Sequence, residues 1–223
     1  MIKNNQLIFE NHIELSSKLA QKILLIAKKS ISLKGEFTIV LTGGKSVLNL
    51  YKILVKSDSN WDKWHIYISD ERCLPVDDRD RNDQIINNIW LNHSPIPKYN
   101  IHFIRAELGM VESQVDYTNT MKHVGKFDVT LLSVGEDGHT ASLFPCHDYS
   151  ENNNVVLEYN SPKRPKERIS LSYNRLNNSK YVFKIISGSA KKEVVKMLFQ
   201  HKNVPINNIS GDKQVIFINK NAM

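Results

Sequence analysis

The stretch Phe37-Thr-Ile-Val-Leu-Thr-Gly-Gly-Lys-Ser46 decides the fold class of this chain. Its first five residues form an apolar run that predicts a buried strand, and Gly43 and Gly44 predict a sharp turn where that strand ends. The apolar residues that follow keep helical spacing: Val47, Leu48, Tyr51 and Leu54. The stretch therefore predicts a strand, a glycine turn and a helix in succession.

The same alternation continues on both sides of this stretch. Upstream, apolar residues at four-residue spacing predict an amphipathic helix that ends near Gly35: Leu15, Leu19, Ile23 and Ala27. Downstream, two helices are predicted by Ile85, Ile86, Ile89 and Trp90, and by Val111, Val115, Thr118 and Met121. Apolar runs predict further strands at residues 64–69, 101–104, 127–134, 155–157, 169–171, 181–186 and 215–218.

This order predicts an α/β fold with a Rossmann-like, mostly parallel sheet and helices on both faces. Parallel strands need long crossover connections, and these pack back on the sheet as helices. With 223 residues, the chain is long enough for one core, so we expect a single domain over residues 1–223, with room for a small lobe. Ligands of such folds bind beyond the carboxyl ends of the strands, where the glycine turns lie.

The composition is that of an ordinary folded protein, with 41% hydrophobic and 24% charged residues. No run approaches the roughly 18 apolar residues of a membrane helix, and the N-terminus lacks a signal-peptide pattern. We therefore expect a cytoplasmic protein without a membrane partner. Cys73 and Cys146 are too few for a disulfide framework or a zinc site, so we expect reduced thiols.

The formal net charge of +7 admits a nucleic-acid partner. The basic residues are scattered, however, and the densest cluster holds only Lys163, Arg164, Lys166 and Arg168. An anionic small substrate explains the same excess, and so does a compositional bias toward Lys, Asn and Ile. We expect no nucleic-acid partner, and the sequence leaves the oligomeric state open.

The turn at Thr42-Gly-Gly-Lys-Ser46 is suited to a phosphate group. Its glycines let the backbone approach a ligand, and the N–H groups that open the next helix attract an anion. A nucleotide-binding P-loop is excluded, since Ile39 stands where its first glycine is required. A bare structural turn explains the same residues.

The next strand ends in three adjacent charges, Asp70-Glu-Arg72. Arg72 is able to donate hydrogen bonds to a phosphate or carboxylate while Asp70 or Glu71 orients it. Charges at a strand end are also typical of a solvated surface. The acidic residues that follow lack the glycine and the terminal glutamate of a calcium-binding loop, so we expect no metal.

The segment Ser133-Val-Gly-Glu-Asp-Gly-His-Thr-Ala-Ser-Leu-Phe-Pro145 is the most informative. Its glycine spacing imitates a dinucleotide fingerprint, but Pro145 would end the next helix after a turn or two, so we expect no nicotinamide cofactor. His139 is able to move a proton near neutral pH, and Asp137 is placed to orient it. No Gly-x-Ser-x-Gly elbow is present, which favours activated water as the nucleophile.

Together these three segments resemble the 6-phosphogluconolactonase family over nearly the whole chain. Residues 42–46 are similar to the family's Ser-Gly-Gly-x-Thr-Pro turn, and residues 70–72, with Pro75 and Asn82, to its Asp-Glu-Arg loop. Residues 135–145 are similar to its hallmark segment. The resemblance implies hydrolysis of 6-phospho-D-glucono-1,5-lactone to 6-phospho-D-gluconate in the oxidative pentose phosphate pathway, without a cofactor.

The resemblance also implies a set of site residues. Ser161-Pro-Lys with Glu167-Arg-Ile-Ser-Leu171, and Ser187-Gly-Ser-Ala-Lys191, look like two further family segments. They add Arg168 and Lys191, which would otherwise pass for surface charges. The expected catalytic residues are His139 and Asp137. The expected substrate-binding residues are Gly43, Gly44, Asp70, Arg72, Gly135, Arg168 and Lys191.

The sequence departs from the family pattern at three positions. Ser133 replaces the usual glycine, Val47 stands where proline is common, and Arg81 stands where serine is usual. None of these changes removes a proton-transfer or phosphate-binding group. We therefore expect altered local turns and the same reaction.

Two alternatives to a lactonase stay open. A glucosamine-6-phosphate deaminase typically shows Asp-Glu-Tyr and Gly-His-Ile-Ala-Phe-Asn-Glu-Pro, so Arg72 and residues 140–144 favour the lactonase. A non-catalytic sugar-phosphate sensor would not need His139 beside Asp137. A nucleic-acid-binding module is a third, less favoured class, and it would show steeply salt-dependent DNA affinity.

Overall fold

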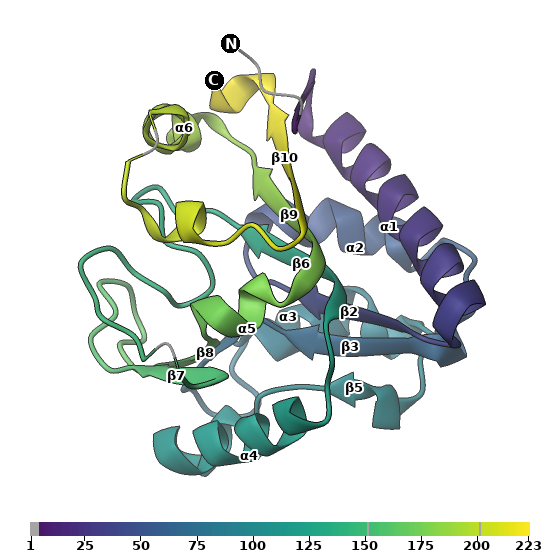
Figure 1. The fold of residues 1–223 in the computed structure, drawn as a ribbon, viewed down its shortest axis with the longest axis horizontal. Coiled ribbons are helices and arrows are strands. Elements are labelled where there is room, and N and C mark those ends of the chain that lie inside the picture. Colours follow the sequence, from purple (N-terminus) through teal and green to yellow (C-terminus); the bar gives the residue numbers. More distant parts are fainter. Residues whose placement is uncertain (1–4, 151, 201) are drawn as a thin grey trace.

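The main sheet has seven strands, all parallel, in the order β1-β10-β9-β6-β2-β3-β5 (Figure 1). The computed structural model describes residues 5–150, 152–200 and 202–223. The strands are β1 (Gln6–Phe9), β2 (Phe37–Leu41), β3 (Trp64–Ile68), β5 (Ile101–His102), β6 (Phe127–Ser133), β9 (Ser179–Ile186) and β10 (Lys213–Asn219). The predicted mostly parallel sheet is confirmed.

A second, antiparallel sheet of three strands lies beside the main one, in the order β4-β8-β7. Its strands are β4 (Asp70–Arg72), β7 (Val155–Glu158) and β8 (Arg168–Leu171). The strands predicted at residues 155–157 and 169–171 belong to this smaller sheet. Two short strands, β1 and β4, were not predicted, because neither has a long apolar run.

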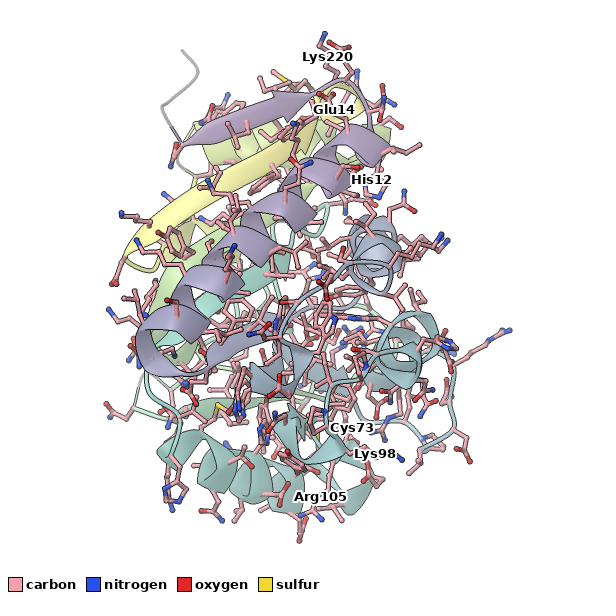
Figure 2. All side chains as sticks on the ribbon, turned by 90° about the vertical axis from the view of Figure 1, so that its right-hand side faces the viewer. His12, Glu14, Cys73, Lys98, Arg105 and Lys220 are labelled. Carbon is pink, nitrogen blue, oxygen red and sulfur yellow. The ribbon has the colours of Figure 1, made fainter. Side chains whose placement is uncertain are left out.

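Helices cover both faces of the main sheet, as expected. They are α1 (His12–Lys34), α2 (Leu48–Leu54), α3 (Asn82–Ile89), α4 (Met110–Lys122), α5 (Tyr173–Asn177) and α6 (Lys192–Phe199). Figure 2 shows α1 lying across one face of the sheet, and Figure 1 shows α5 and α6 on the other side of β9 and β10. Among the described residues, no helix is long and apolar enough to cross a membrane.

The first helix follows the sequence prediction closely. The Asn11 side chain accepts hydrogen bonds from the N–H groups of Ile13 and Glu14, which caps the helix start. Gly35 ends the helix with a φ of 82°, a conformation that favours glycine. The predicted apolar stripe is buried: Leu15, Leu19, Ile23 and Ala27.

The prediction for α4 was right about the helix and wrong about its buried face. Val111 and Val115 are each 55% exposed, whereas Tyr117 is fully buried. The Tyr117 hydroxyl donates to the backbone O of Ile68 (2.9 Å) and accepts from its N–H (3.0 Å). Burial of Tyr117 stabilises the fold more than burial of the two valines would. The aromatic ring removes more apolar surface from water, and its hydroxyl hydrogen-bonds the backbone at the end of β3.

Candidate active site

A cavity of about 430 Å³ opens at the carboxyl edge of the main sheet. Loops after β2, β6 and β9 form it together with β4, β8 and the loop between β7 and β8. Of the nine predicted site residues, eight line it: Gly43, Gly44, Asp70, Arg72, Gly135, His139, Arg168 and Lys191. The ninth, Asp137, does not line the cavity, but it is hydrogen-bonded to His139, which does. The fold thus brings together residues that are far apart in the sequence.

His139 and Asp137 form a close pair in the loop after β6. The Nδ1 of His139 lies 2.5 Å from Oδ1 of Asp137, which also accepts the backbone N–H of His139 at 3.2 Å. No other described residue hydrogen-bonds the imidazole, so Nε2 is left unpartnered on a ring that lines the cavity. The arrangement suits an imidazole that exchanges a proton with a ligand.

The charge of Asp137 is stabilised by the same contact. Burial works against the carboxylate, but the hydrogen bonds and positive charge of His139 outweigh it and hold the pKa of Asp137 well below its usual range. Lys163 contributes in the same direction. Asp137 is therefore ionised at neutral pH.

Gly135 makes room for this pair. A Cβ at Gly135 would lie 2.0 Å from Nδ1 of His139 and 2.6 Å from Oδ1 of Asp137. No other residue fits there without moving the imidazole. This position was predicted as substrate-binding, and the structure adds that it accommodates the His139 ring.

Phe144 stacks on His139, and Arg168 in turn lies over the Phe144 ring. The Phe144 ring lies on His139 with centroids 4.7 Å apart, and the guanidinium of Arg168 lies 5.6 Å from the Phe144 centroid. Phe144 is 1% exposed, and its backbone N–H donates to the Tyr149 hydroxyl at 3.0 Å. The residues after Gly138 form this platform through turns and a bridge between Thr140 and Leu143, not through the helical turn expected there.

The glycine turn after β2 is fitted to its neighbours. A Cβ at Gly43 would lie 1.8 Å from the Asn82 Oδ1, so only glycine fits. Ser133, the departure from the family pattern, lies with its Oγ 3.3 Å from the Thr42 Oγ1 and donates to the Gly43 carbonyl at 3.4 Å. Ser133 therefore links the two glycine turns instead of disturbing them.

Asn82 was quoted for its motif but not predicted as a site residue. It is 1% exposed, and its Nδ2 donates to the backbone O of Asp70 at 2.9 Å. Its Oδ1 is buried without a hydrogen-bond partner and lies at the cavity. The resemblance of residues 70–82 to the family's Asp-Glu-Arg loop was the one signal that set this asparagine apart from the chain's others.

The sequence suggested that Asp70 or Glu71 orients the Arg72 guanidinium. Neither of them does so. Asp70 accepts hydrogen bonds from the hydroxyls of Ser69 and Ser142, both at 2.7 Å. Glu71 is fully buried, does not line the cavity and accepts hydrogen bonds from the backbone N–H groups of Asn82 and Asp83. The Nη1 of Arg72 instead donates to the backbone O of Asp80, and its Nε is buried without a partner.

The cavity is strongly basic. Its cations are Lys45, Arg72, Lys163, Arg164, Arg168 and Lys191, against the carboxylates of Asp70 and Glu136. Burial lowers the pKa of Lys191 and of Arg168. Lys163 and Arg164 were not predicted as site residues: the sequence showed both in a basic cluster, and Lys163 also in a segment that resembles a family loop. That their loop lies at the site cannot be inferred from spacing.

Arg168 is held by its own loop. Its Nε donates to the Pro165 carbonyl, and its Nη2 donates to the carbonyls of Lys163 and Arg164, all at 3.1 Å. No hydrogen bond joins Nη1 to another described residue, which leaves it available to a ligand. Among the described residues, no group of His, Cys, Asp and Glu side chains is arranged to hold a metal ion.

Comparison with known proteins gives a consistent result. Residues 10–217 match the family model described as glucosamine-6-phosphate isomerases/6-phosphogluconolactonase. The crystal structure of 6-phosphogluconolactonase from Thermotoga maritima superposes with a TM-score of 0.90 at 28% identity, covering 96% of this chain and 99% of that one. A monomeric glucosamine-6-phosphate deaminase shares the fold, with a TM-score of 0.86 at 18% identity.

Plant relatives are longer. The chain is 33% identical over 215 residues to a probable chloroplastic 6-phosphogluconolactonase 4 of Oryza sativa, covering 88% of this chain and 66% of the relative. The chain thus spans about two thirds of the length of that relative.

Proposed function

The chain belongs to the family of glucosamine-6-phosphate isomerases and 6-phosphogluconolactonases, and we propose that it is a 6-phosphogluconolactonase. Its reaction is the hydrolysis of 6-phospho-D-glucono-1,5-lactone to 6-phospho-D-gluconate in the oxidative pentose phosphate pathway. The observation that carries the proposal is the His139–Asp137 pair, with Nε2 unpartnered, in a cavity lined by cations. A proton-transfer group and an anion-binding surface are the two parts that this reaction needs.

The phosphate of the substrate is the anchor. A phosphate monoester carries close to two negative charges at neutral pH, and the cavity holds an excess of cations to receive them. The Nε of Arg72 and the free Nη1 of Arg168 are donors without a protein partner. The turn at Gly43 and Gly44 adds backbone that a ligand can approach closely.

The chemical step starts at His139. Its Nε2 takes a proton from a water molecule, and the resulting hydroxide attacks the lactone carbonyl carbon. The oxyanion that forms is stabilised by the cationic side chains of the cavity. The protonated imidazole then gives its proton to the ring oxygen as the carbon–oxygen bond breaks, so His139 is regenerated.

Asp137 acts through His139. Its hydrogen bond to Nδ1 fixes the tautomer that leaves Nε2 unprotonated, and its negative charge stabilises the imidazolium that forms during the step. Phe144 and Gly135 hold the ring from two sides. The mechanism requires neither a metal nor a cofactor. We propose the cytoplasm as the location of the enzyme.

Activity on two substrates tests the proposal. Freshly generated 6-phosphogluconolactone and, separately, glucosamine 6-phosphate are added to the purified protein with EDTA present. We expect acid release well above the spontaneous hydrolysis rate and no ammonia. Ammonia release without lactone hydrolysis would assign the chain to the deaminases. Binding of phosphosugar without either reaction would assign it to the sensors.

A further inference from the structure

A second cavity, of about 490 Å³, lies at the other end of α6. It is enclosed by β9, β10, the start of β1 and the C-terminal end of α6, where Leu198 lines it. No described residue lines both this cavity and the active site. Lys191, which lines the active site, directly precedes α6, so the two cavities are separated by the length of this helix, about 12 Å.

The feature that distinguishes this cavity is Lys184. It lies in β9 between Leu132 of β6 and Ile216 of β10, and it is 2% exposed. Within the described part of the chain, no hydrogen bond or ion pair is found for its ammonium, and the Nζ is not among the fully shielded unpaired atoms, so it opens onto the cavity. Burial lowers the pKa of Lys184 to about 8, without an opposing carboxylate. Buried lysines are normally paired, because an unpaired buried charge is strongly unfavourable.

Two buried acceptors without partners lie in the same cavity. Gln214 and Asn5 both line the cavity, and the Oε1 of the former and the Oδ1 of the latter are buried without a hydrogen bond to any described residue. More than nine in ten buried polar atoms in proteins are hydrogen-bonded. One unpaired cation and two unpaired acceptors around one cavity therefore define a complementary ligand: an anionic group combined with hydroxyl donors.

We propose that this cavity binds a small hydroxylated anion, whose charged group lies against Lys184 and whose hydroxyls donate to Gln214 and Asn5. Lys202, at the rim, adds a second positive charge. Carboxylate and phosphate both satisfy the charge, and the hydroxyls distinguish a sugar acid or sugar phosphate from an inorganic anion. The site is separate from catalysis, and it explains why a buried lysine without a counter-charge is kept in the central sheet.

The Lys184 signal itself reports binding. Protein labelled with ¹³C-lysine is titrated with sodium gluconate and, separately, with inorganic phosphate, and the Lys184 Cε resonance is assigned by its absence from Lys184→Met. We expect saturable shifts of this resonance, a rise in the pKa of Lys184 on binding, and affinity for gluconate about tenfold above that for phosphate. A Lys184 resonance that moves with neither anion would overturn the proposal.

Three variants sharpen the test. Gln214→Leu keeps the ammonium and should weaken gluconate about tenfold while leaving phosphate unchanged. Lys196→Met removes an exposed lysine of α6 that pairs with Glu193, and it should bind gluconate like the wild type. Lys184→Met should raise the thermal midpoint, since it removes an unpaired buried charge. A lower midpoint, or equal weakening by Lys196→Met, would contradict the proposal.

Discussion

Arg72 and Arg81 belong to the same loop region, yet their surroundings are opposite. Arg81 is 2% exposed and donates to Asp83 at 2.7 and 3.0 Å and to Glu107 at 3.0 Å. Arg72 leaves its Nε buried without a partner at the active-site cavity. The difference teaches that charges fully partnered within the protein hold the fold, whereas charges left incomplete are available to a ligand.

Glu71 belongs to the partnered group. It accepts hydrogen bonds from the backbone N–H groups of Arg72, Asn82 and Asp83, all at 2.8 Å. The departure from the family pattern at Arg81 thus completes a buried network that supports β4 and the start of α3. Among the described residues, the unpartnered group comprises the Arg72 Nε, the Asn82 Oδ1 and the His139 Nε2.

The largest expected effect on stability comes from Arg81→Met. Removing one member of a buried ion pair leaves Asp83 uncompensated, which costs about 3–5 kcal/mol of the free energy of unfolding. Urea unfolding measures it. Arg105→Met, which breaks the exposed pair with Asp116, is the matched control and should leave the unfolding midpoint nearly unchanged. Equal losses in both variants would remove the distinction drawn between partnered and exposed charges.

Gly135→Ala tests the unpartnered group, through the position of His139. The added Cβ overlaps His139, and a displacement of about 1 Å at a catalytic group is expected to lower turnover roughly 10²-fold. Steady-state acid release from the lactone measures it. Gly125→Ala is the control, since a Cβ there meets nothing within 4 Å. Full activity in Gly135→Ala would mean that the observed imidazole position is not the working one.

Arg72→Met should act on substrate and not on the fold. Loss of a charged hydrogen bond of about 1.5–3 kcal/mol predicts a fall in kcat/KM of roughly 10- to 100-fold at an unchanged thermal midpoint. Arg79→Met removes an exposed charge from the same loop and should keep the wild-type kcat/KM. If both variants lose the same fraction of kcat/KM, Arg72 acts only through the overall positive charge of the loop and not through a specific hydrogen bond.

A pH dependence of stability is expected from Glu71. Burial and then the negative charge of Asp83 raise the pKa of Glu71 to about 8, although backbone N–H groups partly offset this. The folded protein therefore holds this proton more tightly than the unfolded chain, and the free energy of unfolding should fall as pH rises from about 4.5 to about 8. In urea unfolding at pH 5 and 8.5, the free energy of unfolding of Glu71→Gln should fall less between the two pH values than that of the wild type. An equal fall in both proteins would contradict the assignment to Glu71.

The sequence predicted what rests on periodicity and missed what rests on packing. Six of the strands predicted from apolar runs belong to the parallel sheet, and the stripe of α1 is buried as expected. The exposed face of α4 was misjudged because spacing alone gave Val111 and Val115 the same weight as a buried aromatic residue. A short strand such as β4 forms because β8 pairs with it, which no local pattern reveals.

The residues of the candidate site also divide into those that sequence motifs predict and those that depend on packing. Motifs located His139, Asp137 and the glycine turns, because those residue types are limited by chemistry and by space. The stacking of Phe144 between His139 and Arg168, and the unpaired oxygen of Asn82, depend on contacts across the fold. Spacing along the chain carries no record of such contacts.

The central claim is that His139 is the general base of a lactone hydrolase. Acid release from freshly generated 6-phosphogluconolactone, with EDTA present and the spontaneous rate subtracted, tests it most directly in wild type and His139→Ala. We expect turnover to fall about 10²–10⁴-fold in the variant, with the thermal midpoint retained. Turnover by His139→Ala at the wild-type rate would contradict it.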